Sequence, residues 1–149
     1  MRIALGSDHA GYVLKEKLKK FLIVRGCEVL DFGTDSEQAV DYPDYIIPAA
    51  EAVADGRAQC GIVLGGSGNG EAIAANKVTG IRCALCWNKD AARLAKQHND
   101  ANMIALGARM IAADMEFEIV ATWLDTEFEA GRHVARIEKI GGYERRHGA

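Results

Sequence analysis

The chain is short of the features that mark secreted, membrane-spanning and nucleic-acid-binding proteins. Its 149 residues include only 2 prolines and 4 cysteines. No apolar run approaches the length of about 18 residues that a transmembrane helix needs, so we expect no membrane span. The start, MRIALGSDHAG, has one arginine and no long apolar region, so we expect no signal peptide. Lys and Arg number 18 against 21 Asp and Glu, whereas a general nucleic-acid binder would be basic.

The few cysteines favour reduced thiols and a cytoplasmic location. Cys83 and Cys86 have the C-x₂-C spacing, but no second ligand pair accompanies them, so we expect no zinc site. Side chains three apart on a strand face opposite sides, which also disfavours a disulfide between them. We expect these cysteines to pack in the interior instead.

The overall composition is that of a globular protein. Hydrophobic residues make up 49% and charged residues 26% of the chain. No repeat, low-complexity segment or linker divides the sequence, and we expect a single domain over residues 1–149.

Short apolar runs alternate with helical patterns along the chain. We expect strands at Arg2–Gly6, Glu28–Phe32, Gly61–Leu64, Ile81–Leu85 and Met103–Leu106. We expect helices at Gly11–Arg25, Asp44–Asp55, Ile73–Asn76, Lys89–Gln97, Ala113–Thr126 and Ala130–Ile140. This alternation predicts a parallel sheet covered on both faces, because the crossovers are right-handed. Ligands of such sheets bind beyond the carboxyl ends of the strands.

The stretch Gly65–Glu71, GGSGNGE, follows the third expected strand and is the most informative motif. Its alternating glycines would expose N–H groups at a helix start, which suits a phosphate or an oxyanion formed during a reaction. The plainer interpretation is a tight turn that needs positive φ angles. The spacing matches neither a nucleoside-triphosphate loop nor a dinucleotide fingerprint. Glu71 is either a general base or a partner of the helix dipole.

Other polar residues also lie where elements end. Asp8 and His9 follow the first strand, where they could bind a sugar and its phosphate, although Asp8 could simply cap the next helix. His98 and Asn99 end a helix, where a dipole partner and a helix stop are the common roles.

Three arginines are candidates for an anion site. Arg132 and Arg136 are four residues apart, so one helix face presents both guanidinium groups. Such a pair suits a phosphate, although a solvated charged face is the more common meaning. Arg109 follows the fifth strand, where a side chain can face a ligand.

Together these motifs resemble the type B ribose-5-phosphate isomerases and their relatives, the galactose-6-phosphate and allose-6-phosphate isomerases. The matching segments cover nearly the whole chain: Ile3–Gly11, Asp41–Asp44, Gly65–Lys77, Ile81–Trp87, His98–Met110 and Arg132–Ile137. The resemblance implies a three-layer α/β/α sandwich, Rossmann-like, with a five-stranded parallel sheet in the order 2-1-3-5-4. It also implies a homodimer, or a pair of dimers, with active sites built from both subunits and a C-terminal helix, about 130–141, that reaches the partner.

The resemblance further implies roles for residues, without a metal or an organic cofactor. Glu71 would move the proton between carbons, and His98 would assist opening of the furanose ring. Substrate binding would fall to Asp8, His9, Gly66, Ser67, Gly68, Asn69, Gly70, Asn99, Arg109, Arg132 and Arg136. Many members have a cysteine base directly before the glycine loop. Here that position is Gly65, and Glu71 matches a subgroup with a glutamate after the loop.

The resulting hypothesis is an aldose-ketose isomerase of the pentose phosphate pathway that interconverts ribose 5-phosphate and ribulose 5-phosphate through an enediolate. One alternative is an isomerase of a four- or six-carbon sugar phosphate, such as allose 6-phosphate or galactose 6-phosphate. The other is a non-catalytic module that only binds a sugar phosphate.

Overall fold

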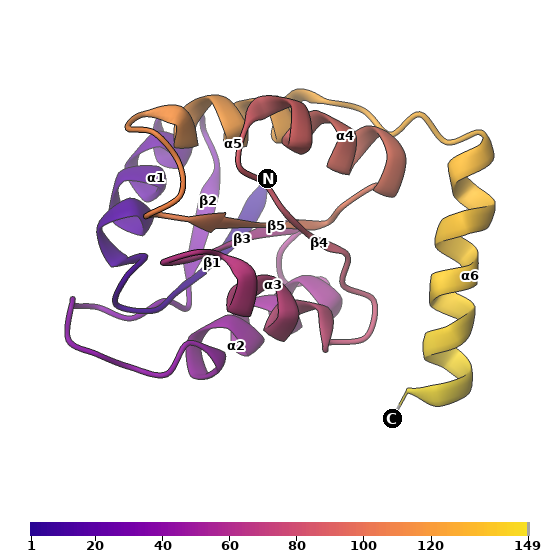
Figure 1. The fold of residues 1–149 in the computed structure, drawn as a ribbon, viewed down its shortest axis with the longest axis horizontal. Coiled ribbons are helices and arrows are strands. Elements are labelled where there is room, and N and C mark those ends of the chain that lie inside the picture. Colours follow the sequence, from indigo (N-terminus) through magenta and orange to yellow (C-terminus); the bar gives the residue numbers. More distant parts are fainter. Residues whose placement is uncertain (149) are drawn as a thin grey trace.

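A five-stranded parallel sheet forms the centre of the molecule in the computed structural model, which describes residues 1–148 (Figure 1). Its strands are β1 (Arg2–Ser7), β2 (Glu28–Asp31), β3 (Cys60–Gly65), β4 (Cys83–Leu85) and β5 (Met103–Gly107). Their order is β2-β1-β3-β5-β4, and every neighbouring pair is parallel. Both the parallel sheet and its strand order are confirmed.

Helices cover both faces of this sheet. They are α1 (Tyr12–Val24), α2 (Pro43–Ala54), α3 (Asn69–Asn76), α4 (Lys89–Asn99), α5 (Met115–Asp125) and α6 (Arg132–His147). One apolar core joins the sheet to α1, α4 and α5, and a second core joins the other face to α2 and α3. The result is the expected three-layer sandwich, with these two helix layers above and below the sheet in Figure 1.

Several element boundaries differ from those expected, among them the starts of α3 and β4 and the end of α6. The helix α3 begins at Asn69 rather than Ile73, because Gly68 adopts a φ of 84° and turns the chain directly into the helix. The strand β4 begins at Cys83 rather than Ile81, because the Arg82 N–H donates to the Asn102 side chain at 2.8 Å.

The third difference concerns α6, which continues to His147 instead of ending near residue 140. Its C-terminal half is tied to the body where the Gly80 N–H donates to the Glu144 carboxylate at 3.1 Å. Of its residues only His133 is buried, and the helix stands beside the sandwich rather than in a layer (Figure 1). None of the helices in residues 1–148 is long and apolar enough to cross a membrane.

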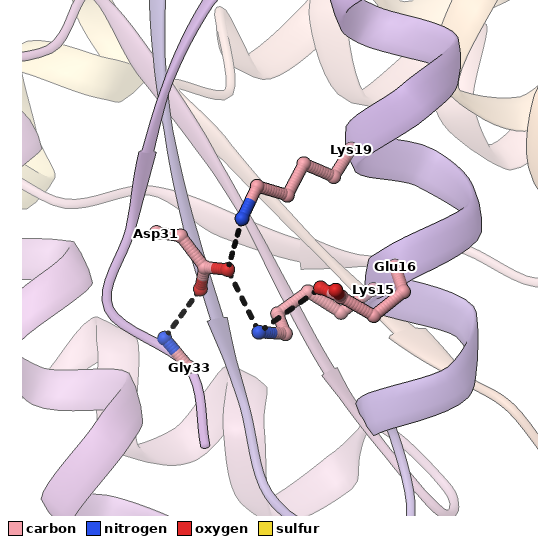
Figure 2. A network of polar contacts seen from close by, with 5 residues as sticks. All are labelled: Lys15, Glu16, Lys19, Asp31 and Gly33. Carbon is pink, nitrogen blue, oxygen red and sulfur yellow. Dashed lines mark hydrogen bonds and ion pairs between the residues drawn. The ribbon is translucent and has the colours of Figure 1, made fainter. Parts of the chain in front are cut away.

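A buried lysine fixes the edge strand β2 to α1 (Figure 2). Lys15 is 2% exposed, and its Nζ lies 2.8 Å from Asp31 Oδ2. Lys19 donates to the same oxygen at 3.1 Å, and the Gly33 N–H donates to Oδ1 at 2.9 Å. Burial raises the pKa of Asp31, but these hydrogen bonds outweigh it and leave the pKa below its ordinary value.

Candidate active site

The carboxyl group of Glu71 lies against the end of β3. Glu71 is in the first turn of α3 and is only 3% exposed. A Cβ atom added at Gly65 would collide with both carboxylate oxygens of Glu71. The glutamate therefore occupies the space that a side chain at position 65 would need, which explains why Glu71 and a cysteine at that position exclude each other in this arrangement.

The surroundings of Glu71 favour its protonated form. Burial is the main cause that raises its pKa, and the nearby charge of Asp8 raises it further. Backbone amides of Glu71 and Gly68 act in the opposite direction, but the pKa remains above its ordinary value. A carboxylate with a raised pKa is a stronger base near neutral pH.

The glycine loop beside Glu71 is held rigidly at the same edge of the sheet. The N–H groups of Ala108 and Arg109 donate to Gly65 O at 2.8 Å and Gly66 O at 3.0 Å. Gly107 has to be glycine, since a Cβ there would run into the backbone of Ser67. The Asn69 N–H donates to Ser67 Oγ at 3.2 Å, and the Gly68 amide faces Glu71. The other amides of the loop are held in a fixed geometry, which is what stabilisation of an oxyanion requires.

Three predicted side chains join this loop. Asp8 is 8% exposed and accepts a hydrogen bond from the Gly11 N–H at 3.0 Å, so it closes the turn that precedes α1 but does not cap the helix, whose N-cap is Gly11. His9 Nδ1 accepts from the Val40 N–H at 3.1 Å, which leaves Nε2 as the donor of the neutral ring. The Arg109 guanidinium lies beside Gly66, so a cation faces the loop.

Tyr42 is a neighbour of the site that the sequence analysis did not assign. It directly precedes α2, is 37% exposed, and a Cβ at Gly70 would lie 2.7 Å from its ring. The sequence feature that could have placed Tyr42 near the site is DYPD. Proline at the first position of a helix places the preceding residue at the carboxyl edge of the sheet, since α2 follows β2.

The remaining predicted residues lie elsewhere. The helix α4 runs back from the carboxyl end of β4 to the amino end of β5, so His98 and Asn99 lie at the amino edge of the sheet. Arg82, directly before β4, donates from Nε to Asn99 O at 2.9 Å, in agreement with that position. Arg132 and Arg136 are exposed on the first turns of α6, where the His133 ring stacks on His98.

The predicted site residues therefore form two groups. The carboxyl-edge group comprises Asp8, His9, Gly66, Ser67, Gly68, Asn69, Gly70, Glu71 and Arg109, and the amino-edge group comprises His98, Asn99, Arg132 and Arg136. In Figure 1, α6 marks the amino edge, and the β5 arrowhead points toward the other. A single chain does not bring Glu71 and His98 together.

The cysteines contribute nothing to either group. Cys83 belongs to one core and Cys86 to the other, and all four cysteines are free. Burial raises the pKa of Cys60 to about 11 and that of Cys86 to about 12, so these thiols are poor nucleophiles at neutral pH.

Comparisons with known proteins match almost the whole chain. A family model described as Ribose/Galactose Isomerase matches residues 3–140. Ribose-5-phosphate isomerase B of Escherichia coli is 43% identical over 145 residues, which are 97% of each chain. The structure of Clostridium thermocellum ribose-5-phosphate isomerase B superposes with a TM-score of 0.97 at 51% identity, covering 99% of this chain and 100% of the other. The Mycoplasma genitalium enzyme with bound ribulose-5-phosphate gives 0.92 at 36% identity, covering 97% and 96%.

Proposed function

Because the chain belongs to the ribose/galactose isomerase family, we propose that it interconverts ribose 5-phosphate and ribulose 5-phosphate. The observation that carries this proposal is the Glu71 carboxylate, buried at the end of β3 beside a loop of backbone amides. A base next to oxyanion donors is what an enediolate reaction needs. A module that only binds a sugar phosphate has no use for the base.

In this mechanism Glu71 removes the proton from C2 of the open aldose and returns it to C1, while the hydroxyl proton on O2 moves to O1. The negative charge that develops on oxygen is stabilised by N–H groups of the Gly66–Gly70 loop, each worth about 3 kcal/mol in comparable sites. Proton transfer by a positioned carboxylate contributes about 10²–10⁴-fold in rate. The raised pKa of Glu71 suits both directions of the transfer, because the same group acts as base and then as acid.

The two groups of site residues would meet in a homodimer, or in a pair of such dimers. The carboxyl-edge group of one chain would supply the base and the oxyanion donors, and the amino-edge group of the partner would supply ring opening through His98. Arg132 and Arg136 of α6 would bind the phosphate together with Arg109 and His9, while Asn99 would contact the sugar. The exposure of both arginines on a helix that stands beside the body supports this arrangement.

We further place the reaction in the cytoplasm. All four cysteines are free thiols, as expected in a reducing compartment.

The test combines isotope exchange with a matched pair of substitutions. The wild-type protein should incorporate solvent deuterium into ribose 5-phosphate and form ribulose 5-phosphate. Glu71→Gln should lower kcat by about 10²–10⁴-fold while binding of the sugar phosphate persists. Glu51→Gln, the same change at an exposed helical position, should leave kcat unchanged.

Each contrary result has a distinct meaning. A wild-type protein that binds the sugar phosphate but exchanges no deuterium would be a binding module. A Glu71→Gln variant with near wild-type kcat would show that the base lies elsewhere. Comparison of kcat/KM among four-, five- and six-carbon aldose phosphates tests the chain length, since the loop and the base read only the reacting carbons.

A further inference from the structure

The amino-edge group contains a second histidine that the proposed reaction leaves without a role. His98 is partly exposed in the last turn of α4, whereas His133 in the first turn of α6 is 4% exposed. The two rings are stacked, with centroids 4.4 Å apart and planes inclined by 15°. Among residues 1–148, His133 Nε2 is buried without a hydrogen-bond partner. Such a nitrogen costs the fold free energy, which points to a role besides packing.

The backbone holds these two rings face to face. The Glu129 N–H donates to Gln97 O at 3.1 Å and so attaches the segment before α6 to the last turn of α4. Ala130 and Gly131 follow with φ values of 58° and 53°, and this sharp turn starts α6 with His133 against His98. The stack is therefore built into the chain path and does not depend on a loosely placed side chain.

Burial favours the neutral form of the His133 ring, and four charged or titratable groups surround it. They are His98 on α4, Glu129 on the preceding segment, and Arg132 and Arg136 on α6 itself. Burial, followed by the positive charges, lowers the pKa of His133, and Glu129 opposes this only in part. Glu129 Oε2 lies 3.7 Å from His133 Nε2, too far for a hydrogen bond, and its side chain is 48% exposed.

The residues His98, Glu129 and His133 lie close together but are not arranged as metal ligands. The ligand atoms of His98, Glu129 and His133 lie within 4.8 Å of one another. However, stacked imidazoles direct their in-plane lone pairs side by side rather than toward one point between them. The arrangement suits ring orientation and proton placement better than coordination.

We propose that His133 is a positioning residue for His98, an inference that rests on the proposed isomerase function. The buried ring holds the His98 imidazole in one orientation by stacking. Because it stays neutral, it also does not compete for the proton that His98 gives to the sugar. In that step the bond between C1 and the ring oxygen breaks, its electron pair stays on the ring oxygen, and His98 protonates that oxygen. The C1 hydroxyl releases its proton to solvent as the aldehyde forms.

Isotope exchange offers a specific readout. Ribose 5-phosphate is mainly a furanose and has to open, whereas ribulose 5-phosphate is open, because its C5 oxygen carries the phosphate and cannot close on C2. The two directions of isomerisation do not respond independently, since the ratio of their kcat/KM values is fixed by the equilibrium constant. Exchange of the C1 proton of ribulose 5-phosphate with solvent deuterium needs Glu71 but no ring opening. A defect in ring opening therefore lowers isomerisation more than this exchange, whereas general loss of structure lowers both equally.

The primary experiment measures kcat and KM for ribose 5-phosphate, and solvent deuterium exchange into ribulose 5-phosphate, for two variants of His133 and one control. His133→Ala should lower kcat for ribose 5-phosphate about 10-fold or more with little change in KM, and should affect the exchange less. His133→Phe keeps a flat neutral ring and should restore kcat to within about 3-fold of wild type. Glu129→Gln should stay within about 2-fold, because an exposed pair contributes little.

Several results would overturn the proposal. These are wild-type activity in His133→Ala, equal losses in the alanine and phenylalanine variants, a loss of deuterium exchange as large as the loss of kcat, or a loss in Glu129→Gln as large as in His133→Ala. Thermal unfolding and the oligomeric state of each variant show whether it folds and assembles.

A double substitution tests whether His133 acts through His98. If it does, His98→Asn combined with His133→Ala should be no slower than His98→Asn alone, whereas multiplied losses would contradict the proposal. Failure of the proposed function is a separate outcome, since it would appear as a wild-type protein that converts neither sugar phosphate.

Discussion

At the scale of single residues, Gly65 and Glu71 compete for one volume. The missing side chain at position 65 is what lets the Glu71 carboxylate lie at the end of β3. We expect Gly65→Ala to displace that carboxylate and to lower kcat by about 10²-fold, because misplacing a catalytic group by about 1 Å has this effect. Steady-state kinetics with ribose 5-phosphate measures the loss.

A double-mutant cycle on the free energy of unfolding separates this collision from other effects of Gly65→Ala. Overpacking should lower the free energy of unfolding of Gly65→Ala by about 1–3 kcal/mol. In a Glu71→Ala background the space is free, and the added methyl group should cost much less. Equal costs in both backgrounds, measured by urea unfolding, would mean that the two groups do not collide.

Glu71 should also lower the stability of the protein near neutral pH. Its pKa is raised in the folded state, so its contribution to stability is fully present below the unfolded pKa and is lost as pH rises through the folded pKa. We therefore expect Glu71→Gln to have a higher Tm than wild type at pH 7, and the difference to disappear below about pH 4. A Tm at pH 7 that falls instead would contradict the assigned direction.

The sequence predicted residues of the site where a motif carried them. The glycine loop and Glu71 are adjacent in the chain, so their contact follows from local structure. The position of Tyr42 beside the loop depends on how α2 lies against it, and the stack of His133 on His98 depends on a turn far from α4 in sequence. Such tertiary contacts leave no local pattern to read.

At the scale of elements, the attachment of β2 to α1 depends on a buried charge. Asp31→Asn would leave the Lys15 ammonium, which is 2% exposed, with only Glu16 at 3.4 Å. We expect a loss of about 2 kcal/mol in the free energy of unfolding at pH 7, because a buried charge without its partner is costly. Asp55→Asn, which removes an exposed pair with Arg57, is the matched control and should leave the unfolding midpoint nearly unchanged.

The same carboxylate gives a pH dependence. A depressed pKa contributes stability above the unfolded pKa, and this contribution is lost as pH falls through the folded pKa. The difference between wild type and Asp31→Asn should thus be constant above about pH 4 and narrow below it. Denaturant unfolding across this pH range measures the difference in free energy of unfolding. A difference that grows as the pH falls would refute the role of Asp31.

All expected strands and helices exist, because apolar runs and helical spacing report burial directly. The Asn88 side chain, which accepts from the Ala91 N–H at 2.8 Å, caps the start of α4, and asparagine is a common residue at that position. Boundaries were less predictable. The extension of α6 beyond Gly141 ran against the low helix propensity of two glycines, and the start of β4 depended on a side chain of another segment.

At the scale of the whole molecule, the separation of the two groups makes a prediction about mixed dimers. Glu71→Gln and Arg136→Ala chains should each have low activity alone. After mixing, unfolding and refolding in equal amounts, about a quarter of the sites should combine an intact carboxyl-edge group with an intact amino-edge group. Activity should recover to about that fraction of wild type.

A control and a contrary outcome define this experiment. The control mixes Glu71→Gln with a second carboxyl-edge variant, Asp8→Asn. Because both residues belong to the same chain of a site, every mixed site keeps one defect, and we expect no recovery of activity. Absence of recovery in the first mixture, with dimers confirmed by light scattering, would place each site within one chain.

The sequence predicted the sheet order through its resemblance to a family, but the separation of the site residues followed only from the path of the chain. Residues after strands lie at one edge and residues that end helices lie at the other. His98 and Asn99, which end α4, therefore belong to the amino edge however close they lie to Arg109 in sequence.

If each site needs both ends of the sheet, one from each chain of the proposed dimer, activity should respond to dilution. Below the dissociation constant of the dimer, each chain would keep its fold and its bound edge strand but lose turnover, as mass action requires. The rate per chain would then rise with protein concentration before it levels off, and the midpoint of that rise would measure the affinity of one subunit for the other.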